Sequence, residues 1–205
     1  MTRWLKRLGW RLLPLMFWQS FALAAPPVAV TAAEPDASTQ YALWSALITH
    51  GLGADAKSVV IAQRTTDETS AVLAPDAKLE DVAKKLDVSP TLLNAWVAAN
   101  QSSLSLERQF SLRAHYQLLD DKTRADIFTG DDAAANWGRF RAKFPDAPGL
   151  LRLSRTAVDA PAGHALAYIE FTCGPACGSG RLIRALRKGK NWTVISGELI
   201  WIARP

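Results

Sequence analysis

Both cysteines of the chain lie in one short run, Cys173-Gly-Pro-Ala-Cys177-Gly-Ser-Gly180, between two segments that alternate in hydrophobicity like β-strands. Three residues separate the cysteines in a turn, so their Cα atoms can come within the roughly 4.4 to 6.8 Å that a disulfide needs. Such a bond closes a small ring and stabilises the fold by about 2 kcal/mol on the loop-entropy account. The run therefore predicts a hairpin turn clasped by a Cys173–Cys177 disulfide.

The C-terminal part of the chain reads as a sheet. After Pro148-Gly149 the hydrophobic pattern takes a period of two, which is the period of a β-strand. It predicts four strands, over residues 150–158, 164–172, 181–187 and 191–203. The connections between them are short, so neighbouring strands are expected to be antiparallel. We predict an α+β fold in which N-terminal helices pack on a C-terminal four-stranded antiparallel meander.

The upstream part of the chain carries apolar residues at helical spacing. Ser38 and Ser89 are the expected N-caps of two helices, and Pro90 suits the first helical position after Ser89. Helices are predicted over residues 38–50, in two short pieces within 76–100, over 121–128 and over 131–144. Strands are expected over residues 57–63 and 110–119, and the first of them has the β-favouring centre Ser-Val-Val-Ile-Ala.

The first 24 residues have the three parts of a secretory signal peptide. A basic start is followed by an apolar run through Phe21 and by the small-residue exit Ala22-Leu23-Ala24, after which cleavage is expected. The alternative is an uncleaved membrane anchor, but a membrane span needs roughly 20 apolar residues, and Pro14 and Gln19 interrupt this run. We therefore expect a periplasmic or secreted protein with no stable membrane span after signal cleavage.

The rest of the chain divides in two by composition. Residues 25–37, rich in Ala and Pro, are predicted to be a disordered linker, and residues 38–205 a single α+β domain. The full chain has a net charge of +5, yet the signal segment (residues 1–24) holds four of its basic residues and no acidic one. Without that segment 20 basic residues face 19 acidic ones, a net charge of +1. This near balance gives no support to nucleic acid as a partner.

The two cysteines favour a structural disulfide over redox or metal chemistry. A thiol oxidoreductase normally spaces its pair by two residues at a helix N-terminus, whereas here the spacing is three and a strand follows. A zinc site would need two more ligands, and His164 is the only histidine nearby in the sequence, so no metal site is predicted. Ser179 lacks the sequence context of a nucleophile elbow. No catalytic residue and no cofactor is assigned.

The strand after Gly163 offers a candidate binding face. Alternation places His164, Tyr168 and Glu170 on one face of this strand. Arg184 on the next strand is expected to join them and complete a shallow polar site. The alternative is an ordinary half-exposed sheet face with one cross-strand Glu–Arg pair. The opposite face is predicted to be the core face and carries Ala165, Ala167, Ile169 and Phe171.

Residues 79–89, Leu-Glu-Asp-Val-Ala-Lys-Lys-Leu-Asp-Val-Ser, resemble both a DNA-binding helix-turn-helix and the helical part of a LysM peptidoglycan-binding module. Export argues against DNA binding, and the second helix offers Asn94 and Asn100 but no Arg or Lys to a groove. The LysM resemblance covers at most residues 57–119, and it lacks that family's Gly-Gln-x-Leu-x-Ile-Pro ending. An ordinary packed helical hairpin is the third interpretation.

Several spaced elements of the C-terminal half resemble a group of exported bacterial proteins of unknown function. In that group an Ala-Leu-x-Tyr strand leads into a Cys-Gly-x-x-Cys-Gly turn and a closing Trp-x-Val strand. The resemblance covers about residues 130–203 and implies no activity. The matching elements are Trp137-x-x-Phe140, Phe144-Pro145, Leu153-Ser-Arg155, Ala165-Leu-Ala-Tyr168, the cysteine run and Trp192-Thr-Val.

Together these features predict an exported binding or interaction protein without catalytic activity. Its partner is expected to be an unknown protein or a component of the cell envelope. The binding surface is expected around Tyr168, Glu170 and Arg184 or on the basic C-terminal strands. The alternative is a cell-wall-associated protein, either a LysM-like peptidoglycan-binding protein or a hydrolase, including a thiol-dependent one.

Overall fold

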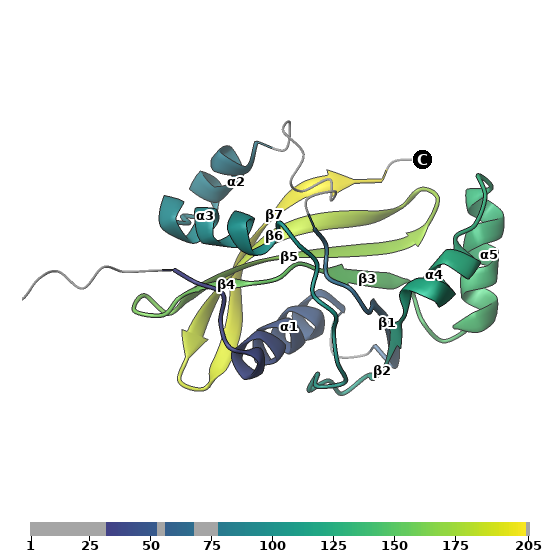
Figure 1. The fold of residues 1–205 in the computed structure, drawn as a ribbon, viewed down its shortest axis with the longest axis horizontal. Coiled ribbons are helices and arrows are strands. Elements are labelled where there is room, and N and C mark those ends of the chain that lie inside the picture. Colours follow the sequence, from purple (N-terminus) through teal and green to yellow (C-terminus); the bar gives the residue numbers. More distant parts are fainter. Residues whose placement is uncertain (1–31, 53–55, 68–77, 204–205) are drawn as a thin grey trace, which may run out of the picture.

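A computed structural model describes residues 32–52, 56–67 and 78–203 of the protein. The predicted signal peptide, residues 1–24, and residues 25–31 of the predicted linker lie outside the described residues. The helices are α1 (Ala37–Leu52), α2 (Leu79–Lys85), α3 (Pro90–Ala99), α4 (Asp121–Ile127) and α5 (Ala133–Lys143) (Figure 1). The strands are β1 (Ser58–Ala62), β2 (His115–Leu119), β3 (Leu150–Leu153), β4 (Ala157–Asp159), β5 (His164–Gly174), β6 (Cys177–Lys188) and β7 (Asn191–Ile202).

One mixed sheet of seven strands runs through the molecule in the order β2-β1-β3-β5-β6-β7, and β4 pairs with β5 beyond the end of β3. β1 is parallel to both β2 and β3, whereas β3, β4 and β6 are antiparallel to β5, and β7 is antiparallel to β6. The predicted four-stranded antiparallel meander is therefore wrong. The three strands joined by short hairpins are antiparallel as predicted, but the sheet continues into a parallel half.

The parallel half was missed because its pairings join distant parts of the chain. Ser58 is opposite His115, and Val60 is opposite Leu150. Hydrophobic periodicity marks such segments as strands but carries no information on which strands become neighbours. All five residues of β1 are buried, as expected of an inner strand with both faces covered.

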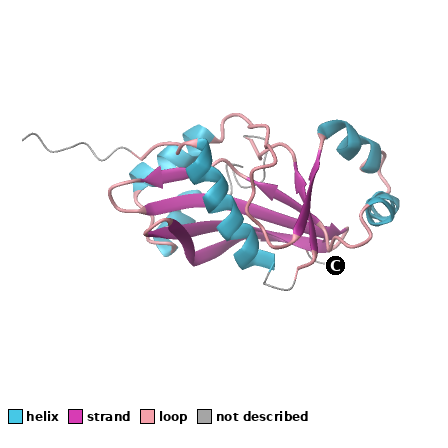
Figure 2. Ribbon diagram, turned by 90° about the horizontal axis from the view of Figure 1, so that it is seen from below, coloured by secondary structure: helices cyan, strands magenta, loops and turns pink. Residues whose placement is uncertain are grey.

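Helices cover both faces of the sheet. In Figure 2, α1 lies diagonally across the strands of one face, where Trp44 and Leu47 pack on residues such as Ala167. On the opposite face α2 and α3 cover β4, β5 and β6, while α4 and α5 cover β1 and β3 near one end of the sheet (Figure 1). Thus the predicted helical hairpin packs on the C-terminal strands. β1 and β2, which flank it in the sequence, pair with each other in parallel.

The predicted strand 150–158 is divided into β3 and β4, and Ser154 lies where it breaks. The Ser154 side chain is fully buried, and its Oγ accepts a hydrogen bond from the backbone N–H of Tyr168 at 2.8 Å. Oγ also accepts from the indole Nε1 of Trp96 in α3 at 3.0 Å, and the Ser154 carbonyl accepts from Nε1 of Trp44 in α1 at 2.9 Å. Ser154 thus accepts a hydrogen bond from one tryptophan on each side of the sheet, Trp96 and Trp44.

The start of α1 differs by two residues from the prediction. Ser38 was expected as the N-cap, but the Asp36 carboxylate accepts the backbone N–H of Thr39 at 3.0 Å and the hydroxyls of Ser38 and Thr39 at 2.6 and 2.9 Å. These hydrogen bonds, that from the Ser38 hydroxyl first, lower the pKa of Asp36 from 3.8 to about 2. The predicted cap of α3 is confirmed, because Ser89 Oγ accepts the N–H of Leu92 at 3.2 Å.

Candidate functional site

The four residues of the predicted binding face fall into two separate pairs. Tyr168 is fully buried and Glu170 is 8% exposed. The Tyr168 hydroxyl donates to Glu170 Oε2 at 3.1 Å and accepts from Trp201 Nε1 at 2.7 Å, and the other oxygen of Glu170 lies 3.4 Å from Arg152 Nη1. Burial first, and then the charge of Glu170, raise the pKa of Tyr168 far above its ordinary value. This pair therefore belongs to a buried, internally bonded polar cluster.

The second pair is His164 with Arg184. Arg184 Nη2 lies 3.1 Å from His164 Nδ1, and Nη1 donates to the Leu86 carbonyl and to Asp87 Oδ2, both at 2.9 Å. Arg184 thus ties β6 to the turn between α2 and α3. The apolar side chains of Leu166 and Leu182, fully buried beneath α2 and α3, lie on this face between the two pairs. The structure does not bring the four residues together into one site.

The cysteine run folds as a clasped hairpin turn. Cys173 and Cys177 form the predicted disulfide between β5 and β6, with their Cα atoms 5.1 Å apart. Gly180 has a role that the sequence did not reveal. A Cβ atom at this position would lie 2.1 Å from the Tyr168 hydroxyl and 2.3 Å from Trp201 Nε1. The glycine therefore makes room for the hydrogen bond between Tyr168 and Trp201 across β6.

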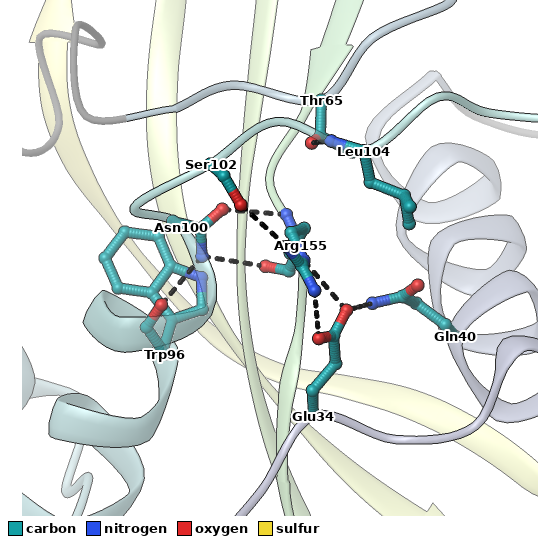
Figure 3. A network of polar contacts seen from close by, with 8 residues as sticks. All are labelled: Glu34, Gln40, Thr65, Trp96, Asn100, Ser102, Leu104 and Arg155. Atoms are coloured by element: carbon teal, nitrogen blue, oxygen red, sulfur yellow. Dashed lines mark hydrogen bonds and ion pairs between the residues drawn. The ribbon is translucent and has the colours of Figure 1, made fainter.

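A second polar network surrounds Arg155 (Figure 3). Arg155 Nε donates to Glu34 Oε1 at 2.8 Å, Nη2 also pairs with Glu34, and Nη1 donates to Ser102 Oγ at 3.1 Å. The buried Asn100 side chain accepts the Arg155 N–H at 2.8 Å and donates to the Trp96 carbonyl at 2.8 Å. Because these groups satisfy one another, the network joins the end of α3 to the segment between β3 and β4 and to the chain before α1.

That chain includes the described end of the predicted disordered linker. The backbone N–H of Ala33 donates to the Val158 carbonyl at 3.1 Å, and the Val158 N–H donates to the Ala33 carbonyl at 2.8 Å. Ala33 thus pairs with β4 through main-chain hydrogen bonds, and the next residue, Glu34, pairs with Arg155. The composition of the segment could not reveal these partners, which lie more than a hundred residues away.

An open cavity of about 640 Å³ lies at the C-terminal end of α1, on the α1 face of the sheet. Its apolar lining comes from four strands and contains Leu151, Ile169, Phe171, Ile183 and Val194. Cavities of this size, with an apolar lining and a few polar groups, are the usual form of small-molecule sites. No residue of the predicted binding face lines it, because alternation along β5 and β6 directs those side chains to the other face.

A bulge in β7 shapes the floor of this cavity. Val194 is opposite Ala185 and Ser196 is opposite Arg184, so Ile195 is an extra residue in β7. Such a bulge interrupts the alternation of the strand, and four consecutive residues, 194–197, line the cavity. Gly197 has no side chain that would project into the cavity. A Cβ atom there would meet only Ile183 Cγ1 at 3.5 Å and the Leu182 carbonyl at 3.7 Å.

The polar groups of the cavity are few and carry no negative charge. His50 in the last turn of α1, Ser179 and Arg181 of β6 and Ser196 of β7 line it, and no Asp or Glu is among the described lining residues. The Arg181 side chain is exposed, and no hydrogen bond or ion pair joins it to the side chain or backbone of another described residue. Within the described part of the chain, the cavity thus combines a guanidinium that has no partner with an apolar floor.

A smaller hollow of about 400 Å³ lies beside the first residues of β1 and β2. Its lining mixes Lys57, His115 and Asp146 with Phe144 and Ala147. Charges of both signs share this small space, so it is the weaker candidate for a ligand site.

Comparison of the chain with protein-family models, with curated proteins and with solved structures finds no match. Among the described residues, no three His, Cys, Asp or Glu side chains are grouped so that they could hold a metal ion. In the same part of the chain, every helix is too short or too polar to cross a membrane. The candidate site therefore has to be judged by its own geometry.

Proposed function

We propose that the protein is an exported binding protein without catalytic activity, and that the cavity at the end of α1 takes a small molecule with a large apolar part. The observation that carries the proposal is the cavity itself, which joins a mostly aliphatic floor to an arginine whose guanidinium has no partner among the described residues. The predicted polar face is covered by α2 and α3 and filled by its own contacts. The cavity is the larger of the two hollows described above.

The floor of the cavity is suited to binding because it is built on strands. Ile169 and Ile183 are 8% and 4% exposed and lie on neighbouring strands of the antiparallel sheet. Side chains held by a sheet lose little further freedom when a ligand arrives, so more of the contact energy appears as affinity. A molecule that covers this floor removes apolar surface from water, which favours binding by roughly 25 cal/mol per Å².

Export is supported by two features of the chain. The N-terminal residues have the composition of a signal peptide. The disulfide between Cys173 and Cys177 suits an oxidising compartment such as the periplasm or the extracellular space.

Binding of the neutral fluorescent probe N-phenylnaphthylamine tests the proposal. The wild-type protein should bind the probe saturably, and Gly197→Leu, which raises a side chain from the floor, should weaken binding at least about tenfold. Gly138→Leu makes the same change on the exposed side of α5, where a Cβ atom has nothing within 4 Å, and should leave binding unchanged. No saturable binding by the wild type, or equal binding by Gly197→Leu, would refute the proposal.

A further inference from the structure

Arg181 is the first feature that restricts which ligands can bind, because its charge favours an anionic group. This residue lies in β6 opposite Ile169 of β5 and Leu199 of β7, so its side chain stands in a row of apolar neighbours on the cavity face. Among the described lining residues none is acidic, so the Arg181 guanidinium gives this part of the cavity a positive charge. A planar guanidinium beside apolar surface matches a carboxylate, which it can bind through two parallel hydrogen bonds.

The C-terminal end of α1 favours a ligand group with one negative charge over a group with two. His50, Gly51 and Leu52 line the opposite side of the cavity, so the C-terminal end of α1 borders it. The backbone carbonyls at a helix C-terminus carry a partial negative charge, which disfavours a dianion close to them. A group with a single negative charge at Arg181 fits this field better than a phosphate dianion.

The side chains of the cavity floor restrict the shape of the ligand's apolar part. Its side chains are those of aliphatic residues and Phe171, and no Trp or Tyr is among the described lining residues. On the edge strand β7, Ile195 of the cavity lining and Leu199, which lies outside the cavity, are 43% and 41% exposed. Apolar surface therefore continues from the cavity along the open edge of the sheet, which suits an extended chain.

We infer that the ligand is an unbranched aliphatic monocarboxylate. Its carboxylate pairs with the guanidinium of Arg181, and its chain lies on the floor formed by residues such as Ile169 and Ile183. The inference rests on the proposed function, because it names the ligand class of the same cavity.

Isothermal titration of the mature protein tests the inference, with dodecanoate and dodecylamine each below its micelle concentration and dodecanol below its solubility limit. Dodecanoate should bind at least about tenfold more tightly than dodecanol, because only the acid gains the charged hydrogen bonds. The amine should bind most weakly, because Arg181 repels it. Arg181→Gln should bring the affinity for dodecanoate down to that for dodecanol, whereas Arg187→Gln, on the same strand but outside the cavity, should change neither affinity.

The outcomes separate the two proposals. Equal affinity for dodecanoate and dodecanol, or tighter binding of the amine, would overturn the carboxylate as ligand and leave the apolar site in place. Absence of binding by all three compounds and by N-phenylnaphthylamine would overturn the proposed function as well. The wild-type comparison of the three compounds needs no variant, so it decides the matter even if Arg181→Gln does not fold.

Discussion

Ser154 is the residue on which both helical layers converge. It is fully buried, its Oγ accepts from Trp96 on one side of the sheet, and its carbonyl accepts from Trp44 on the other. Oγ also accepts the N–H of Tyr168, in place of the main-chain partner that an unbroken strand would supply. A buried donor without an acceptor costs about 1 to 3 kcal/mol, so one hydroxyl here satisfies two costly groups.

Ser154→Ala should destabilise the fold by about 2 kcal/mol or more, because it leaves the indole N–H of Trp96 and the amide of Tyr168 without an acceptor. Urea unfolding followed by tryptophan fluorescence measures the change. Ser111→Ala, at an exposed position before β2, is the control and should stay within about 0.5 kcal/mol of wild type. A loss as small in Ser154→Ala would show that water or a shifted side chain replaces the hydroxyl.

Asp36 makes the stability of α1 depend on pH. Its pKa is about 2 in the folded protein and near 3.8 when unperturbed. A carboxylate with a lowered folded pKa contributes stability above its unfolded pKa and loses that contribution as the pH falls through the folded value.

Asp36→Ala should therefore melt at a lower temperature than wild type at neutral pH, and the gap should narrow as the pH falls from about 4 to about 2. Melting followed by circular dichroism across this range measures the gap. Asp126→Ala removes an equal charge from an exposed position of α4 and controls for net charge. A gap for Asp36→Ala that stays constant from neutral to acid pH would contradict the capping role.

At the scale of elements, the β5–β6 hairpin is the best-defined local unit of the chain. The disulfide closes its tip, and Gly180 lets Trp201 of β7 reach across to Tyr168 of β5. The strands and the disulfide could be predicted from the sequence because the residues that determine them are close together in the chain, whereas the contact between Trp201 and Tyr168 over Gly180 could not. β5 begins at His164 and β7 at Asn191, both as predicted.

Reduction of the Cys173–Cys177 disulfide should lower the free energy of unfolding by about 2 kcal/mol, because the reduced unfolded chain regains conformational freedom. Urea midpoints with and without reductant measure the change, and the double variant C173S/C177S should show no response to reductant. Mass after alkylation should rise only if reduction comes first. Two free, highly reactive thiols in the unreduced protein would instead favour the thiol-dependent enzyme considered as an alternative.

At the scale of the whole molecule, the sequence was least informative about which surfaces meet. The alternation along β5 separates Tyr168 from Ile169 correctly, but both faces are buried, since α1 covers one and α2 with α3 the other. A polar residue on a strand can lie on the surface or in the interior with hydrogen-bond partners, and Glu170 is of the second kind. Only the partners, Arg152 and Trp201, distinguish the two cases.

The cavity could not be predicted because its walls come from separate parts of the chain. His50 lies in the last turn of α1, Leu151 belongs to β3, and Arg181 lies in β6. One local signal was present in Ser196-Gly197, since a glycine inside a strand often marks a bulge or a close approach. In the structure, a bulge lies at Ile195, and the missing side chain at Gly197 leaves space in the cavity.

We propose that the α1 face of the sheet, and not the face beneath α2 and α3, holds the ligand. Side-chain methyl shifts of the isotope-labelled mature protein, recorded while dodecanoate is added, test this most directly. We predict saturable shifts for the methyl groups of Ile169, Ile183 and Val194, which line the cavity, and none for those of Leu166 and Leu182, which point to the opposite face. Shifts centred on Leu166 and Leu182, or no saturable shift at the cavity residues, would contradict the account.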